Sequence, residues 1–137
     1  MWGDGDVEIR EESKIPPKPI VKSAKDLAVF KRAYVFSLEL HKVSLTFPKI
    51  EQFSLANQLR RASKSVGANL VEGFSRQSES KLEFKRYITI AIGSANETDL
   101  WINYAFDLGY INQDMFQNWV KENDVVIGML VNLRKRL

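Results

Sequence analysis

A group of basic side chains in the central stretch of the sequence offers the clearest candidate for chemistry. Six residues make up this group: Arg60, Arg61, Lys64, Arg76, Lys81 and Lys85. Two of its pairs, Arg60 with Lys64 and Lys81 with Lys85, are four residues apart and would share a helix face. Cations spaced in this way can neutralise neighbouring phosphates of a nucleic acid. The pattern predicts a nucleic-acid-binding surface.

The same residues have a structural interpretation, which the sequence leaves open. Basic runs are common on helix faces turned to water, and arginines can pair with Glu72, Glu79 or Glu83 inside a helical bundle. Glu72 and Arg76 are four residues apart, which suits an ion pair along one helix. The adjoining Asn69 and Gly73 are most simply packing residues.

Residue types exclude most catalytic chemistry. The chain has no cysteine, which rules out disulfides, zinc-thiolate sites and cysteine nucleophiles, and His41 is its one histidine. Glu97, Asp99 and Glu122 are carboxylates without the Glu-x-x-His pairs of a di-iron bundle. No phosphate-binding loop or dinucleotide fingerprint occurs. We therefore expect a protein that is not an enzyme and binds no metal or cofactor.

Three aromatic residues, Trp101, Tyr104 and Trp119, have rings on which bases can stack. Their spacing is also that of helix residues that face a core or a neighbouring subunit. His41 likewise lies on an apolar helix stripe, which favours a packed residue over a ligand.

Composition indicates one soluble domain. Of 137 residues, 45% are hydrophobic and 27% charged. No apolar run is long enough to cross a bilayer, and the N-terminus lacks the basic start and apolar stretch of a secretory signal. We expect a cytoplasmic protein.

Residues 1–22 are predicted to be a flexible N-terminal tail, and residues 23–137 a single bundle domain. The run Ile15 to Ile20 contains three prolines and favours extended backbone. Residues 1–15 carry a net charge of −3, so the remainder sums to +6. A net positive charge of this size is compatible with binding to a nucleic acid or an acidic partner.

Hydrophobic periodicity predicts four helices, over about 25–45, 54–74, 79–108, and from Asn112 to near the C-terminus. Ser23, Ser54, Ser78 or Ser80, and Asn112 are candidate N-caps, and Gly109 a candidate C-terminal stop. Short connections favour an all-α, antiparallel up-and-down four-helix bundle.

The predicted core follows one apolar stripe on each of the last three helices. The stripes are Leu55, Leu59, Ala62, Val66 and Leu70; Phe84, Tyr87, Ile88, Ala91, Ala95, Thr98, Ile102, Ala105 and Phe106; and Met115, Trp119, Glu122, Val126, Met129 and Leu133. In the third helix, the small residues 93–95 would let a neighbouring backbone come close.

The first helix differs, because two apolar stripes lie on nearly opposite sides of it. They are Leu27, Phe30, Tyr34, Leu38, His41 and Leu45; and Val29, Ala33, Phe36, Leu40 and Val43. A helix at the edge of a monomer needs one apolar face, so the second predicts a contact with another subunit.

One stretch carries a family motif. Residues 58–76, from Gln58 through Arg60, Arg61, Asn69 and Glu72-Gly73 to Arg76, resemble the Q-x-R-R-A-x-x-S-I-x-x-N-I-A-E-G-x-x-R signature of the 23S rRNA intervening-sequence protein family. This family is also called the four-helix-bundle protein family. Flanking segments at 26–33, 47–55, 90–97 and 108–111 agree, so the resemblance covers roughly residues 25–135. Gly67 and Val71 are modest departures.

The resemblance implies a left-handed up-and-down bundle assembled as a ring-shaped homopentamer, from a bacterium. Family genes lie within rRNA intervening sequences, and a related branch comprises accessory proteins of diversity-generating retroelements, which bind a reverse transcriptase and nucleic acid. The implied function is a non-enzymatic module that binds RNA or DNA, or acts as a scaffold, through a basic surface. The alternative is a protein-binding adaptor, for example an accessory subunit of a reverse transcriptase.

Overall fold

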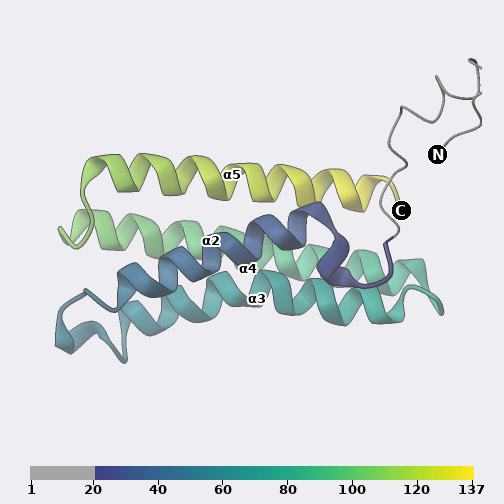
Figure 1. Cartoon of the computed structure of the whole chain (residues 1–137), viewed down its shortest axis with the longest axis horizontal. Coiled ribbons are helices and arrows are strands. Elements are labelled where there is room, and N and C mark those ends of the chain that lie inside the picture. Colours follow the sequence, from purple (N-terminus) through teal and green to yellow (C-terminus); the bar gives the residue numbers. More distant parts are fainter. Residues whose placement is uncertain (1–20) are drawn as a thin grey trace, which may run out of the picture.

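A computed structural model describes residues 21–137, which form four long helices that run alternately up and down (Figure 1). They are α2 (Ala28–Ser44), α3 (Leu55–Arg76), α4 (Lys81–Asp107) and α5 (Gln113–Lys135), with short 3-10 helices η1 (Ala24–Asp26) and η2 (Lys49–Glu51). No strand occurs in this part of the chain. The prediction of an all-α bundle of four helices is confirmed. The predicted tail, apart from residues 21 and 22, lies outside the described residues.

Polar side chains set the starts of α4 and α5, and a glycine follows the end of α4, as predicted, whereas Ser54 makes no capping bond at the start of α3. The side chain of Ser80 accepts a hydrogen bond from the Glu83 N–H at the start of α4, and Asn112 accepts one from the Met115 N–H at the start of α5. Both satisfy donors that a first helical turn leaves unpaired. Gly109 follows α4 at φ +82°, a left-handed conformation that glycine adopts without strain.

The first helix begins later than predicted. Leu27 is extended, at ψ 133°, and separates η1 from α2. The carboxylate of Asp26 accepts hydrogen bonds from the N–H groups of Lys22 and Ser23, at 2.8 and 3.1 Å, and these bonds lower its pKa. These bonds stabilise the short helix η1, which is separate from α2. Ser23 is therefore the N-cap of η1, and α2 starts at Ala28.

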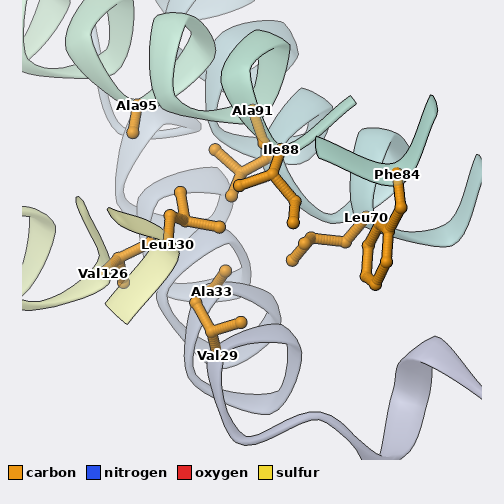
Figure 2. Packing of buried hydrophobic residues seen from close by; sticks show 10 residues of the cluster. Val29, Ala33, Leu70, Phe84, Ile88, Ala91, Ala95, Val126 and Leu130 are labelled. Carbon is orange, nitrogen blue, oxygen red and sulfur yellow. The ribbon is translucent and has the colours of Figure 1, made fainter. Parts of the chain in front are cut away.

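Side chains from all four helices fill the core (Figure 2). One cluster, which includes Val29, Leu70, Ile88 and Leu130, occupies one half of the bundle, and a second cluster around Trp119 occupies the other half. The predicted core stripes of α3 and α4 are buried or half-buried throughout. No helix among the described residues is long and apolar enough to cross a membrane.

The predicted seam of α5 is wrong at two positions. Asn123 and Leu130 are buried, at 2% and 0% exposed, whereas the predicted Glu122 and Met129 are half-buried beside them. The side-chain amide of Asn123 donates to the main-chain oxygen of Ala95, at 2.8 Å. This bond satisfies the buried amide donor, which explains how a polar residue occupies the seam.

Helices α3 and α4 approach closely at Gly73, and within the predicted small group the Ser94 hydroxyl lies 2.8 Å from that of Ser65 on α3. A Cβ on Gly73 would lie 2.6 Å from the Cβ of Tyr87 and 3.0 Å from a ring carbon of Phe84. A Cβ on Gly93 would have no neighbour within 4 Å. The glycine in the family motif therefore has a packing role, as its structural interpretation predicts.

Candidate nucleic-acid interface

The six predicted binding residues fall into two groups rather than one patch. Arg60, Arg61 and Lys64 lie in the first half of α3, while Arg76 is its last residue and Lys81 and Lys85 begin α4. At 1.5 Å per residue, Arg61 and Arg76 are about 22 Å apart along the helix. The two groups therefore have to be weighed separately.

Within the first group, Arg60 is held by contacts inside the bundle. Its guanidinium donates to the Ser44 hydroxyl at 2.8 Å, to the side-chain oxygen of Gln52 at 3.2 Å and to the Gln52 main-chain oxygen at 2.7 Å. The amide of Gln52 in turn donates to the main-chain oxygens of Ser44 and Phe47. Gln52 thus satisfies the Ser44 carbonyl at the end of α2, where a helix lacks intrahelical donors, and Arg60 holds Gln52 in place.

The other two cations of this group are exposed, and one of them contacts His41. The ammonium of Lys64 lies 2.9 Å from Nδ1 of His41, while Arg61 is open to solvent. Burial lowers the pKa of His41, and the nearby charges of Lys64 and Arg60 lower it further. The histidine is therefore a neutral acceptor and not a cation of the surface.

The second group is part of a larger cluster of basic side chains at one end of the bundle, which we call the basic end. The turn from α3 to α4, the start of α2 and the end of α5 meet at this end of the bundle (Figure 1). It carries Lys22, Lys25, Arg76, Lys81, Lys85, Arg86, Arg134, Lys135 and Arg136 against Asp26, Glu72, Glu79 and Glu83. These cations come from three separate segments, so sequence proximity alone could not group them.

Two arginines of the basic end pair with carboxylates on their own helices. Arg76 contacts Glu72 at 2.9 Å and Arg86 contacts Glu83 at 3.4 Å. All four side chains are more than a third exposed, so such pairs contribute little free energy and can open to a phosphate. The predicted Glu72–Arg76 pair is confirmed.

The aromatic candidates differ in their access to a ligand. Trp119 is buried, at 1% exposed, and its indole N–H donates to Glu39 at 2.6 Å, so its ring cannot stack on a base. Tyr104 is half exposed and packs against the ring of Trp101 on α4. These two rings are the accessible ones of the three.

The candidate carboxylates lie apart and have partners of other kinds. Glu122 forms an ion pair with Arg32 at 2.7 Å, and Glu97 accepts from the Trp101 indole at 3.2 Å. Burial and the charge of Asp124 raise the pKa of Asp99. No group of three or more metal-ligating side chains occurs within residues 21–137.

An apolar groove lies between α2 and α3, where a second face of the first helix was predicted. Its volume is about 420 Å³, and Phe30, Tyr34, Leu38 and Val71 are among its lining residues. Tyr34 and Leu38 are 54% and 40% exposed, so the bundle leaves this part of the stripe uncovered, whereas Leu27 and Phe30 pack against the core. Gly67 leaves room there, since a Cβ would lie 3.2 Å from the Phe30 ring.

A second exposed apolar stripe runs along α4 and was missed in the sequence. Leu82, Ile90, Leu100, Tyr104 and Leu108 are all 43% to 75% exposed. They share one face with Arg86, Gly93 and Glu97, because these positions recur every three to four residues. The more strongly apolar core stripe of α4 was assigned from the sequence, and this weaker one was overlooked.

Comparisons with known proteins agree with the fold. A crystal structure of a Bacteroides thetaiotaomicron protein from the S23 ribosomal protein family, itself of unknown function, superposes with a TM-score of 0.71. The two sequences are 23% identical, and the match covers 81% of this chain and 98% of that one. No curated protein matches this sequence. The profile of the 23S rRNA-intervening sequence protein family matches residues 25–132, so this chain belongs to that family.

Proposed function

We propose that this protein is a non-enzymatic, homo-oligomeric module that binds nucleic acid through phosphate contacts at the basic end of its bundle. The observation that carries the proposal is the convergence there of cations from η1, the α3–α4 turn and the end of α5. Such a surface contacts the phosphate backbone and carries little sequence information. Of the predicted residues, Arg76, Lys81 and Lys85 belong to it, and Arg61 and Lys64 provide a separate, weaker contact.

Self-association would strengthen this function, and the exposed apolar faces favour it. The α2–α3 groove and the outward stripe of α4 are two different apolar faces, and a closed ring requires two different faces that meet between neighbours. The family resemblance implies a pentamer, in which each basic end would be repeated five times. Linked weak sites then bind one nucleic-acid strand far more tightly than a single site.

The decisive measurement is fluorescence anisotropy with labelled single-stranded and double-stranded RNA and DNA over a salt series. We expect affinity to fall steeply with salt and to depend little on sequence. Lys81→Glu with Lys85→Glu should abolish most binding, whereas Lys42→Glu with Lys49→Glu, at the opposite end of the bundle, should have little effect. Equal losses in both double variants would overturn the assignment to the basic end.

A further double variant tests the first group of cations. Arg61→Glu with Lys64→Glu should weaken binding less than the change at Lys81 and Lys85. If it weakens binding more, the main phosphate contact lies on the first half of α3, as the sequence pattern alone predicts.

The α2–α3 groove also supports the alternative of a protein-binding adaptor, for example for a reverse transcriptase. An apolar surface of this kind suits a helix of another protein. Capture of a specific protein that survives nuclease treatment and is lost in Leu38→Glu, with no nucleic-acid binding by the purified protein, would favour the adaptor.

A further inference from the structure

The N-terminal residues that precede the bundle are acidic, opposite in charge to the basic end. Their acidic residues are Asp4, Asp6, Glu8, Glu11 and Glu12, with Arg10 and Lys14 as the only cations of residues 1–15. The described chain starts at Val21, beside η1, and η1 is itself part of the basic end (Figure 1). The acidic residues are therefore joined through residues 13–20 to the surface of opposite charge.

Several cations of the basic end form no ion pair within the described residues and can bind a partner. Among residues 21–137, its ion pairs are Arg76–Glu72 and Arg86–Glu83, and neither Lys81 nor Lys85 takes part in one. An open cavity of about 560 Å³ lies between η1 and the end of α3, with Lys22 and Lys25 at its border. A segment carrying several carboxylates would find both space and cations there.

The length of the connection restricts where Glu11 and Glu12, the acidic residues nearest the bundle, can bind. Glu12 is nine residues from Val21, so it reaches at most about 30 Å from the start of the described chain. That is enough to reach every side of the basic end, but α4 alone extends about 40 Å toward the opposite end. A tether this short also keeps the segment at a high effective concentration.

We propose that residues 4–12 dock on the basic end of their own bundle and cover the cations that bind phosphate. The docking is electrostatic and reversible, so a nucleic acid has to displace the segment. The contact itself does not require the proposed function, and only its competitive effect rests on it.

The absence of cysteine allows a direct test in the full-length protein. A single Ser13→Cys variant carries a nitroxide spin label, and NMR measures the broadening of backbone amides. At low salt, amides of Lys81 and Lys85 should broaden strongly, and those of Asp107 and Asp114, at the opposite end, should not. The broadening should decrease as salt screens the charges.

Charge variants in the labelled protein separate docking from mere proximity of the label. Neutralising the five acidic residues should remove most of the broadening, through Asp4→Asn, Asp6→Asn, Glu8→Gln, Glu11→Gln and Glu12→Gln. The reciprocal double variant, Arg10→Gln with Lys14→Gln, makes the segment more acidic and should increase the broadening. Broadening that is the same in all three proteins would overturn the proposal.

Two further measurements place the contact. Mixing spin-labelled protein with isotope-labelled protein that has no spin label should produce little broadening, because the segment binds its own bundle. Strong broadening in the mixture would overturn docking within one chain. Adding an excess of unlabelled duplex should release the segment and reduce the broadening.

Binding assays separate this proposal from the proposed function. Neutralising the segment should raise affinity for nucleic acid roughly fivefold at low salt. If the spin label shows docking but no variant binds nucleic acid, docking stands and the proposed function fails. If nucleic acid binds but the broadening does not depend on the acidic residues, the proposed function stands and docking fails.

Discussion

Gly73 lies at a close contact between α3 and α4, and its missing side chain makes that contact possible. The Cβ and ring atoms of Tyr87 and Phe84 occupy the space that a side chain would need. The neighbouring backbone cannot move without separating two helices whose core side chains interlock. One hydrogen atom in place of a methyl group thus sets the spacing of two helices.

Substitution of this glycine has an expected cost. Gly73→Ala should lower the free energy of unfolding by about 1–3 kcal/mol, because an added methyl group overfills the contact. The matched control is Gly128→Ala in α5, where a Cβ has no neighbour within 4 Å. It should raise the free energy of unfolding by about 0.5–1 kcal/mol, since alanine favours the helix. Urea unfolding measures both, and equal effects would contradict the packing argument.

His41 makes stability depend on pH. Its pKa in the folded chain is below the ordinary value of 6.5, because burial and nearby cations disfavour the imidazolium. The unfolded chain therefore binds more protons, and the stabilising contribution is complete above pH 6.5 and is lost as the pH falls toward the folded pKa. His41→Gln should lose less stability than the parent over this range. Parallel pH profiles in urea unfolding would contradict this assignment.

At the scale of elements, the connection between α2 and α3 is held by side chains rather than by a cap at Ser54. Gln52 donates to the Ser44 carbonyl at the end of α2, and Arg60 donates to Gln52 and to the Ser44 hydroxyl. The Glu51 carboxylate accepts from the Leu55 N–H at 3.4 Å and from the Tyr110 hydroxyl at 2.7 Å. The side chain of Ser54 makes no capping bond. The bond to Glu51 raises the pKa of Tyr110.

Adjacent arginines should therefore differ in their effect on stability. Arg60→Ala should lower the free energy of unfolding by about 1.5–3 kcal/mol, because it removes charge-assisted bonds to partly buried acceptors. Arg61→Ala should change it by less than about 0.5 kcal/mol, as expected for an exposed residue. Urea unfolding of the two variants gives the comparison, and similar losses would show that the Arg60 contacts do not stabilise the connection.

The helices and most of their buried faces could be predicted because periodicity and capping are local properties of the sequence. The burial of Asn123 could not be predicted, because it depends on a hydrogen bond from its side-chain amide to a main-chain oxygen of another helix. The break at Leu27 depends on a carboxylate that binds two N–H groups behind it. The motif located α3 correctly but did not reveal that Arg60 is engaged internally.

At the scale of the whole molecule, the bundle has two apolar faces that its own packing leaves partly exposed. The groove on α2 and α3 and the stripe on α4 belong to different helices, which is the arrangement that a ring needs. The basic end could not be predicted as a unit, because three segments form it only once the helices are packed.

Association should therefore depend on the groove and not on exposed apolar residues in general. Leu38→Glu should shift the protein toward monomers, because it places a charge in the proposed contact. Val35→Glu is the matched control, since Val35 is 65% exposed on the same helix but lines a cavity toward α5. Light scattering at several concentrations distinguishes them. A parent protein that is already monomeric would overturn the inference from the two-faced helix.

The buried amide of Asn123 also determines how the distant basic end is composed. Sliding α5 along α4 by one turn, about 5.4 Å, would separate this amide from the Ala95 oxygen and leave it buried without an acceptor, at a cost of about 1–3 kcal/mol. The hydrogen bond thus selects one axial alignment of α5. That alignment decides where Arg134, Lys135 and Arg136 stand beside the α3–α4 turn. A neutral amide in the middle of the bundle therefore fixes the position of the cations at its end.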